Sequence, residues 1–312
     1  MLAWIRLFRL ALAPTILWDV TAGFLFAEAL IQNNKAIARQ SFESEATVSS
    51  WQWAGPQLAL TGAILLAVFH AGMALNDWAD RRIDKEAQRK RPLVDGTIKP
   101  KSALLAALLM LGAAAAAAFW VHPEPIWILA LCGLVMAYDL GGSAVRSGLG
   151  PLLLALCRTI SFSSGLLLLL SPQAAANSQA PWGIASYALY VLFLARLAAK
   201  EEDGGPGMNM LPPIVLMCLS PFPLTQLESE QTLWLHLAWL GFAVWHLLPA
   251  LPDRHIIWHP LRVQAGVRRA LVAMPALPAM VLIAADAPLW QAAIGVAVAA
   301  ITVQLARRLA PE

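Results

Sequence analysis

Long apolar runs alternate with short polar segments along the whole chain of 312 residues. A helix that crosses a membrane needs roughly 20 mainly apolar residues, and runs of about that length recur here. They fall at about residues 10–31, 57–79, 102–120, 125–140, 149–170, 182–200, 210–227, 231–250, 268–285 and 288–306. The pattern predicts an all-α, polytopic transmembrane helical bundle of nine or ten spans, in a single domain over residues 1–312. Four prolines interrupt the run from Met210, so this run is the one least expected to cross.

The composition agrees with a multi-pass protein embedded in a lipid bilayer. Hydrophobic residues make up 59% of the chain and charged residues only 13%, whereas soluble domains carry about a quarter charged residues. A net charge of +3 gives no reason to expect a nucleic-acid partner. The three cysteines, Cys132, Cys157 and Cys218, lie inside apolar runs without C-x2-C spacing, which predicts neither a metal cluster nor a disulfide framework.

An acidic motif begins where the second apolar run ends. Asp77, Asp80 and Asp84 stand at positions i, i+3 and i+7, so on a helix they fall within roughly 60° of one another. Carboxylates gathered on one face repel each other unless a cation lies among them, and Mg²⁺ suits such oxygen ligands. Four Lys or Arg follow within residues 85–91 and can hold a polyanion. Acids for a metal followed by bases for an anion indicate a diphosphate site.

The same stretch resembles a known family. The string N-D-x2-D-x3-D…R-P-L-x2-G, from Asn76 to Gly96, is similar to the first aspartate-rich motif of the UbiA prenyltransferase superfamily of intramembrane aromatic prenyltransferases. The resemblance implies a UbiA-like bundle and Mg²⁺-dependent transfer of an isoprenyl group from a prenyl diphosphate to a lipophilic acceptor, aromatic or lipid-like. It implies metal ligation and catalysis by Asp77, Asp80 and Asp84. Asn76 would join both the metal and the diphosphate, and the diphosphate would also contact Arg89 and Arg91.

Three further positions follow the fourth apolar run. In the resembled family a Tyr and a basic residue face the substrate cavity here, which implies cavity roles for Tyr138 and Asp139 and a diphosphate contact for Arg146. Arg158 lies nine residues inside the next apolar run, where a guanidinium needs a carboxylate or a phosphate. It is expected either to bind the diphosphate or to form a salt bridge with Asp139 or Asp19. Asp19, also inside an apolar run, is expected to have a partner on a neighbouring helix or to face the cavity.

A second acidic segment follows the sixth apolar run. Arg196, Lys200 and Glu201 can be laid on the first half of the family's second acidic motif, but the later acids would fall on Gly204 and Met208. The resemblance implies a cavity role for Arg196, a diphosphate contact for Lys200 and a catalytic role for Glu201. The acids are instead consecutive, and they are predicted to complete the metal site as Glu201, Glu202 and Asp203.

Consecutive residues point in different directions on a helix, so these three acids can reach one metal only if the segment unwinds. The Gly-Gly-Pro-Gly that follows favours unwinding. A helix end capped by charge is the alternative for this segment.

The distribution of bases predicts the orientation. Residues 81–101 hold eight of the 22 Lys and Arg, so the loops that carry the acidic motifs are expected on the cytoplasmic side. Two other functions fit parts of the pattern. A CDP-alcohol phosphatidyltransferase would need Gly where Arg81 stands, and a transporter or a non-catalytic binding member of the fold would need no intact second motif.

Overall fold

The structure is a computed structural model that describes residues 2–33, 50–201, 203–227, 232–247 and 257–309. Helices dominate it, as the apolar pattern predicts, and the described residues add one antiparallel pair of two-residue strands. The elements are α1 (Leu2–Leu7), η1 (Leu10–Leu12), α2 (Ala13–Asn33), α4 (Ser50–Glu86), α5 (Pro100–Val121), α6 (Pro125–Leu140), α7 (Gly142–Gly148), α8 (Gly150–Leu166), α9 (Pro172–Ala176), α10 (Ala180–Ala198), β1 (Gly205–Pro206), α11 (Gly207–Leu219), η2 (Phe222–Gln226), α12 (Thr232–Leu247), β2 (Ile257–Trp258), α13 (Pro260–Ala273), α14 (Ala276–Ala284) and α15 (Leu289–Leu309).

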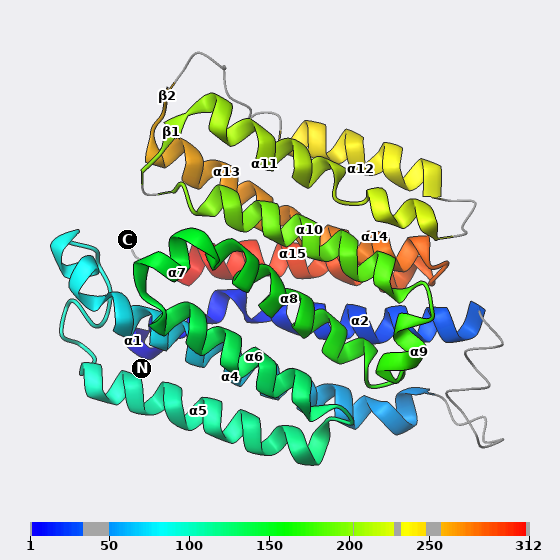
Figure 1. The fold of residues 1–312 in the computed structure, drawn as a ribbon, viewed down its shortest axis with the longest axis horizontal. Coiled ribbons are helices and arrows are strands. Elements are labelled where there is room, and N and C mark those ends of the chain that lie inside the picture. Colours follow the sequence, from blue (N-terminus) through cyan, green and yellow to red (C-terminus); the bar gives the residue numbers. More distant parts are fainter. Residues whose placement is uncertain (1, 34–49, 202, 228–231, 248–256, 310–312) are drawn as a thin grey trace.

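The long helices lie roughly parallel to one axis, and successive long helices run in opposite directions, except that α14 continues α13 (Figure 1). Within the described residues, six helical stretches are long and apolar enough to cross a membrane. They are Leu10–Asn33, Ala54–Glu86, Pro100–Val121, Ala180–Ala198, Gly207–Gln226 and Pro260–Ala284. Four shorter apolar helices accompany them. The proline-rich run from Met210, the one least expected to cross, lies in one of the six long stretches.

Several boundaries differ from the expected ones, and α4 already begins at Ser50, seven residues before the expected start. The second run was expected to end near residue 79, but α4 continues to Glu86, so all three motif acids lie on the helix itself. The Arg, Lys and Glu residues near the end of α4 are good helix formers, and no Gly or Pro interrupts this stretch. The ninth run was expected to start near residue 268, but α13 begins eight residues earlier, at Pro260, and Pro275 separates it from α14.

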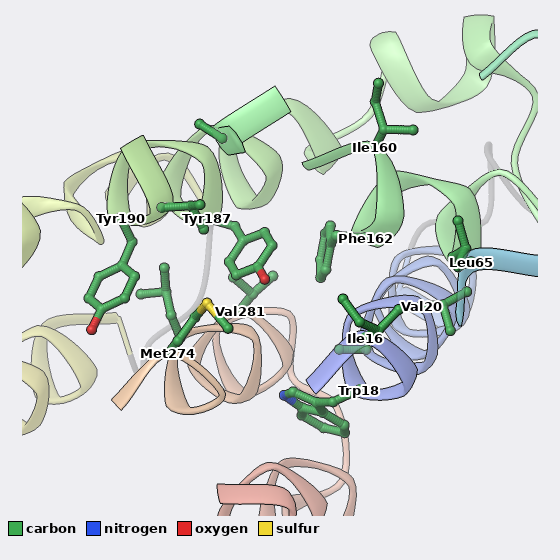
Figure 2. Packing of buried hydrophobic residues seen from close by; sticks show 14 of the residues in the cluster. Ile16, Trp18, Val20, Leu65, Ile160, Phe162, Tyr187, Tyr190, Met274 and Val281 are labelled. Atoms are coloured by element: carbon green, nitrogen blue, oxygen red, sulfur yellow. The ribbon is translucent and has the colours of Figure 1, made fainter. Parts of the chain in front are cut away.

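The core gathers around α2, whose buried face includes Trp18, Val20 and Phe24. Figure 2 shows apolar side chains from several other helices meeting this face. Glycines bring α2 and α8 very close: a Cβ added to Gly23 would lie 1.9 Å from the Phe162 carbonyl oxygen. A Cβ on Gly165 would lie 1.8 Å from the Val20 carbonyl oxygen. Only glycine permits this backbone contact from both sides.

The C-terminal ends of α4 and α10, the short helix α7 and the β1–β2 pair all lie at the same end of the bundle, on the left in Figure 1. The fold therefore brings the segments that follow the second, fourth and sixth apolar runs to one end.

Candidate functional site

Two arginines share one oxygen of Asp77. Arg91 Nη1 donates to Asp77 Oδ1 over 2.7 Å, and Arg9 Nη2 donates to the same oxygen over 3.3 Å. The Asp77 side chain is only 4% exposed, so its charge depends on these partners rather than on water.

Arg91 also reaches the last acid of the motif. Its Nη1 lies 2.9 Å from Asp84 Oδ2, and Arg89 Nη1 donates to Asp84 Oδ1 over 3.0 Å. The chain makes this possible by turning back directly after α4: Gln88 adopts a left-handed backbone with φ of 50°, and the Arg89 amide donates to the Asp84 carbonyl over 2.9 Å. Two bases from the loop after α4 are thereby returned to the acidic face of that helix.

Asp80 faces a different element. It accepts a hydrogen bond from Arg146 of α7, which also donates to the carbonyl oxygens of Tyr138 and Asp139. The Arg146 guanidinium lies 5.8 Å from the centre of the Tyr138 ring. Asn76 Nδ2 donates to Asp139 Oδ1 over 3.3 Å. These contacts join the end of α4 to the junction between α6 and α7.

The first acidic motif is thus brought together with most of the cations and cavity residues expected around it: Asn76, Asp77, Asp80, Asp84, Arg89, Arg91, Tyr138, Asp139 and Arg146. Each acid points to an arginine: Asp77 and Asp84 meet at Arg91 Nη1, whereas Asp80 points to Arg146. Within the described part of the chain, no three His, Cys, Asp or Glu side chains lie together closely enough to hold a metal ion.

Arg158 belongs to a separate buried cluster. Its Nη2 donates to Asp19 Oδ1 over 3.1 Å, its Nε lies 3.0 Å from Asp19 Oδ2, and its Nη1 donates to Thr15 Oγ1 over 3.3 Å. The Tyr187 hydroxyl donates to Asp19 Oδ1 over 2.6 Å. Tyr187 on α10 and Phe162 on α8 lie beside each other in the same core region (Figure 2). The structure therefore gives Arg158 the salt bridge with Asp19, one of the two expected for it, and its contact with a diphosphate stays a prediction.

The second acidic segment lies beyond the end of α10. Arg196 is in the last turn of this helix with an exposed side chain. Lys200, Glu201 and Asp203 follow in turns, so this segment has left the helix, as expected. Glu202 lies outside the described residues. The end of α10 shares one end of the bundle with the end of α4 (Figure 1), and joint binding of one diphosphate by both motifs stays a prediction.

Sequence reasoning missed Arg9 and Tyr187 as partners of intramembrane acids. Arg9 lies between α1 and η1 with φ of 49°, an unusual backbone for a non-glycine residue. The Phe8 carbonyl beside it contacts His70 Nδ1 at 2.7 Å, which ties this segment to α4. A pair of bases ahead of the first apolar run was the available signal, but spacing alone does not say which acid a base will meet.

Comparison with known proteins decides the family. Residues 44–261, more than half of the chain, match the family model described as the UbiA prenyltransferase family. The chain belongs to the UbiA prenyltransferase family. UbiA membership confirms the resemblance carried by the motif from Asn76 to Gly96 and, with the apolar helices, makes the chain an integral membrane protein. It leaves the CDP-alcohol phosphatidyltransferase alternative without support.

Two curated relatives of this UbiA family member are 4-hydroxybenzoate octaprenyltransferases. The one from Pseudomonas syringae pv. syringae (strain B728a) is 33% identical over 87 residues, 26% of this chain and 29% of the relative. The one from Janthinobacterium sp. (strain Marseille) is 43% identical over 60 residues, 19% of this chain and 20% of the relative. The matched stretches thus span less than a third of the length of either relative.

A solved structure extends the likeness of this UbiA family member over most of the fold. The structure of a UbiA homolog from Archaeoglobus fulgidus bound to DMAPP and Mg²⁺ matches with a TM-score of 0.52 and 13% sequence identity. The match covers 91% of this chain and 99% of that one. At this identity the likeness establishes the fold.

Proposed function

We propose that this protein is a Mg²⁺-dependent intramembrane prenyltransferase, which moves an isoprenyl group from a prenyl diphosphate to a lipophilic acceptor, aromatic or lipid-like. The observation that carries the proposal is the pairing of three acids on one face of α4 with arginines from three different segments, in a chain of the UbiA family. The DMAPP and Mg²⁺ of the Archaeoglobus homolog support it as ligands of that protein.

The donor set fits Mg²⁺. Carboxylate and amide oxygens are the ligands that this cation prefers, and Asn76, Asp77, Asp80 and Asp84 supply four such side chains on one helix. Asp84 Oδ2 is buried and makes no well-aligned hydrogen bond within the described residues, although Arg91 lies 2.9 Å away. This oxygen is therefore close to a positive charge but accepts no well-aligned hydrogen bond, so it can still bind a metal ion. Glu201, Glu202 and Asp203 would complete the metal site from the end of α10.

The arginines fit the diphosphate. Arg89, Arg91 and Arg146 each hold one or two of the motif acids, and guanidinium groups bind phosphate oxygens in the same fork geometry. We infer that carboxylates released from these arginines bind the metal, while the arginines, with Lys200, bind diphosphate oxygens. Each carboxylate–arginine pair is then replaced by a carboxylate–metal pair and an arginine–phosphate pair, so neither side chain is left with an unpaired charge.

In the reaction, the allylic C–O bond of the prenyl diphosphate breaks and its electron pair leaves with the diphosphate. A nucleophilic atom of the acceptor bonds to the allylic carbon and then loses its proton. Bound Mg²⁺ would offset the charge that develops on the leaving diphosphate. Arg89, Arg91 and Arg146 stabilise the same charge, and this stabilisation is greater in the transition state than in the ground state. Tyr138 would offer its ring to the allylic cation, and Asp139 and Arg196 would line the cavity.

The acidic end of the bundle would face the cytoplasm. The loop after α4 and its flanks hold a concentration of bases, and such concentrations stay on the cytoplasmic side of membranes. Nine or ten crossings agree with the six long and four shorter apolar helices among the described residues.

The proposal is tested by exchanging Asp77 for Asn and measuring Mg²⁺-dependent release of diphosphate from geranyl, farnesyl and geranylgeranyl diphosphate in detergent. Asp77→Asn keeps the size of the side chain but removes the charge shared by Arg9 and Arg91. We expect turnover to fall by at least about a hundred-fold, because one metal ligand and its charge are lost.

Asp95→Asn is the matched control, since Asp95 follows in the same loop with an exposed side chain and should keep full activity. Unchanged turnover in Asp77→Asn would contradict the role of Asp77 as a metal ligand in the proposed reaction. A wild-type protein that binds these diphosphates without releasing diphosphate would instead identify a non-catalytic binding member of the family.

A further inference from the structure

The second acidic segment is fixed at both of its ends. At its start, the Glu201 amide donates to the Ala198 carbonyl over 3.0 Å, which continues from the end of α10. At its finish, the Gly204 amide donates to the Lys200 carbonyl over 2.9 Å, and the chain then enters β1. The position of the turn that carries Glu201 and Asp203 is therefore determined by α10 on one side and by β1 on the other.

β1 is held by a distant part of the chain. Gly205 pairs with Trp258 and Pro206 with Ile257 in an antiparallel ladder, although about fifty residues separate the two strands in sequence. A ladder of two residues per strand is weak by itself. Something other than its backbone hydrogen bonds must fix the register.

The contact at Gly204 is too close for any other residue. A Cβ there would lie 2.2 Å from the Trp258 carbonyl oxygen, and the backbone has φ of 63°. Both observations require glycine, since the left-handed conformation is strained for other residues and the carbonyl is part of the ladder.

The buried side chain of Trp258 can fix the register of the β1–β2 pair. Its side chain is fully buried, while its strand neighbour Ile257 is 68% exposed. The guanidinium of Arg262, from the first turn of α13, lies 4.9 Å from the centre of the indole ring. The indole N–H is buried without an acceptor among the described residues. The ring therefore acts through its shape and its π face and not through a hydrogen bond.

We propose that Trp258, held by Arg262 and paired with Gly205, is a positioning residue that places Glu201 and Asp203 for metal and diphosphate binding. The segment before α13 thereby becomes a further part of the site, beside the segments after α1, α4, α6 and α10. This inference rests on the proposed function for its chemical consequence, but the placement of the turn by Trp258 can be measured without any substrate.

Two measurements on purified full-length protein in detergent test it. The first is the rate of limited trypsin cleavage after Lys200, followed by mass spectrometry, which reports how firmly the turn is held. The second is the Mg²⁺ concentration that gives half of the thermal stabilisation by inorganic pyrophosphate. In Trp258→Leu and Gly204→Ala we expect cleavage about five-fold faster. We expect half-saturation at about ten-fold higher Mg²⁺, as for other residues that orient metal ligands.

Trp258→Phe should stay near wild type in both measurements, because it keeps an apolar ring and loses only an N–H that has no acceptor within the described residues. Gly112→Ala is the control for glycine replacement, since a Cβ at this α5 position meets nothing within 4 Å. If Trp258→Leu does not fold, Arg262→Gln removes the guanidinium from the ring and should shift both measurements in the same directions by smaller factors.

Cleavage at the wild-type rate in the Trp258→Leu or Arg262→Gln protein would overturn the positioning role. Faster cleavage with unchanged Mg²⁺ half-saturation would overturn the link from Trp258 to the metal. Absence of any Mg²⁺–pyrophosphate stabilisation in the wild-type protein would count against the proposed function. The cleavage comparison would then decide by itself whether Trp258 places the turn.

Discussion

The buried acids of this bundle lie where an unpaired charge costs the most free energy, because water cannot reach it. Each of their pairings with an arginine therefore has a direct electrostatic cause. Asp19 is 1% exposed and Asp84 fully buried, so neither can depend on water. An isolated carboxylate in such surroundings would be costly, and a guanidinium supplies both opposite charge and hydrogen bonds. The two clusters differ in their place in the bundle. Asp19 meets Arg158 and Tyr187 in the core, whereas the α4 acids meet arginines at one end of the bundle.

The Asp19–Arg158 pair is expected to matter for stability chiefly when only one partner is removed. Asp19→Leu or Arg158→Met alone should destabilise the protein by about 3–5 kcal/mol, because each leaves an uncompensated buried charge. The double variant should lose less than either single variant. The measurement is a double-mutant cycle of unfolding free energies in detergent; strictly additive losses would show that the two charges are not coupled.

The same double variant tests the diphosphate contact predicted for Arg158. If the residue serves only the salt bridge with Asp19, a folded double variant should keep the wild-type KM for the prenyl diphosphate. A KM raised about ten-fold or more would restore the substrate-binding role, because a lost charge-assisted contact weakens binding by roughly that factor.

At the scale of elements, the α2–α8 crossing depends on paired glycines. Gly23 and Gly165 each let the opposite backbone approach to a distance that a methyl group would occupy. Close approach increases van der Waals contact, which is the main attraction between helices in lipid because no hydrophobic effect operates between them there. The other glycines of the long helices are not equivalent: a Cβ at Gly112 or Gly133 would meet nothing within 4 Å.

Gly165→Ala is therefore expected to be strongly destabilising, by about 2 kcal/mol or more, since the helices must separate to admit a methyl group. Gly133→Ala should be neutral or slightly stabilising, because alanine has the better helix propensity and the space is open. Thermal unfolding of both variants in the same detergent compares them. Equal midpoints for the two proteins would contradict the close crossing.

At the scale of the whole molecule, the distribution of charge gives the bundle two unlike ends. The segments after α4 and α6 carry the acid–arginine cluster, while the opposite end carries short turns such as the one at α9 (Figure 1). Because basic loops of membrane proteins stay on the cytoplasmic side, we expect the end with the acid–arginine cluster to face the cytoplasm.

Cysteine labelling of intact cells tests this orientation. Asn177→Cys, at the end of α9, should react with a membrane-impermeant maleimide from outside, and Lys101→Cys, at the start of α5, only after permeabilisation. Both side chains are exposed in the structure, and a background without Cys132, Cys157 and Cys218 removes other thiols. The reverse pattern would invert the orientation, and labelling of both from one side would contradict the placement of the two ends.

Much of the site could be predicted because its key residues are close in sequence. The helical spacing of Asp77, Asp80 and Asp84 fixes their common face over about two turns, and the helix does continue through them. The proximity of Arg89 and Arg91 to these acids could be expected for the same reason, because both arginines follow the acids closely in the sequence. The contacts of Arg9 and Tyr187 could not be predicted, because these residues lie 68 and 168 positions away in the sequence from the acids that they meet.

The sequence alone determined that the chain is a membrane bundle and that its acids and bases alternate in a UbiA-type motif. Both follow from local properties, the lengths of apolar runs and the spacing of charges along one helix. Only the tertiary structure decided which charge meets which: Arg158 with Asp19 and not Asp139, Arg146 with Asp80, and β1 with a strand that precedes α13. These choices depend on which helices pack together, and packing is settled by side chains far apart in the sequence.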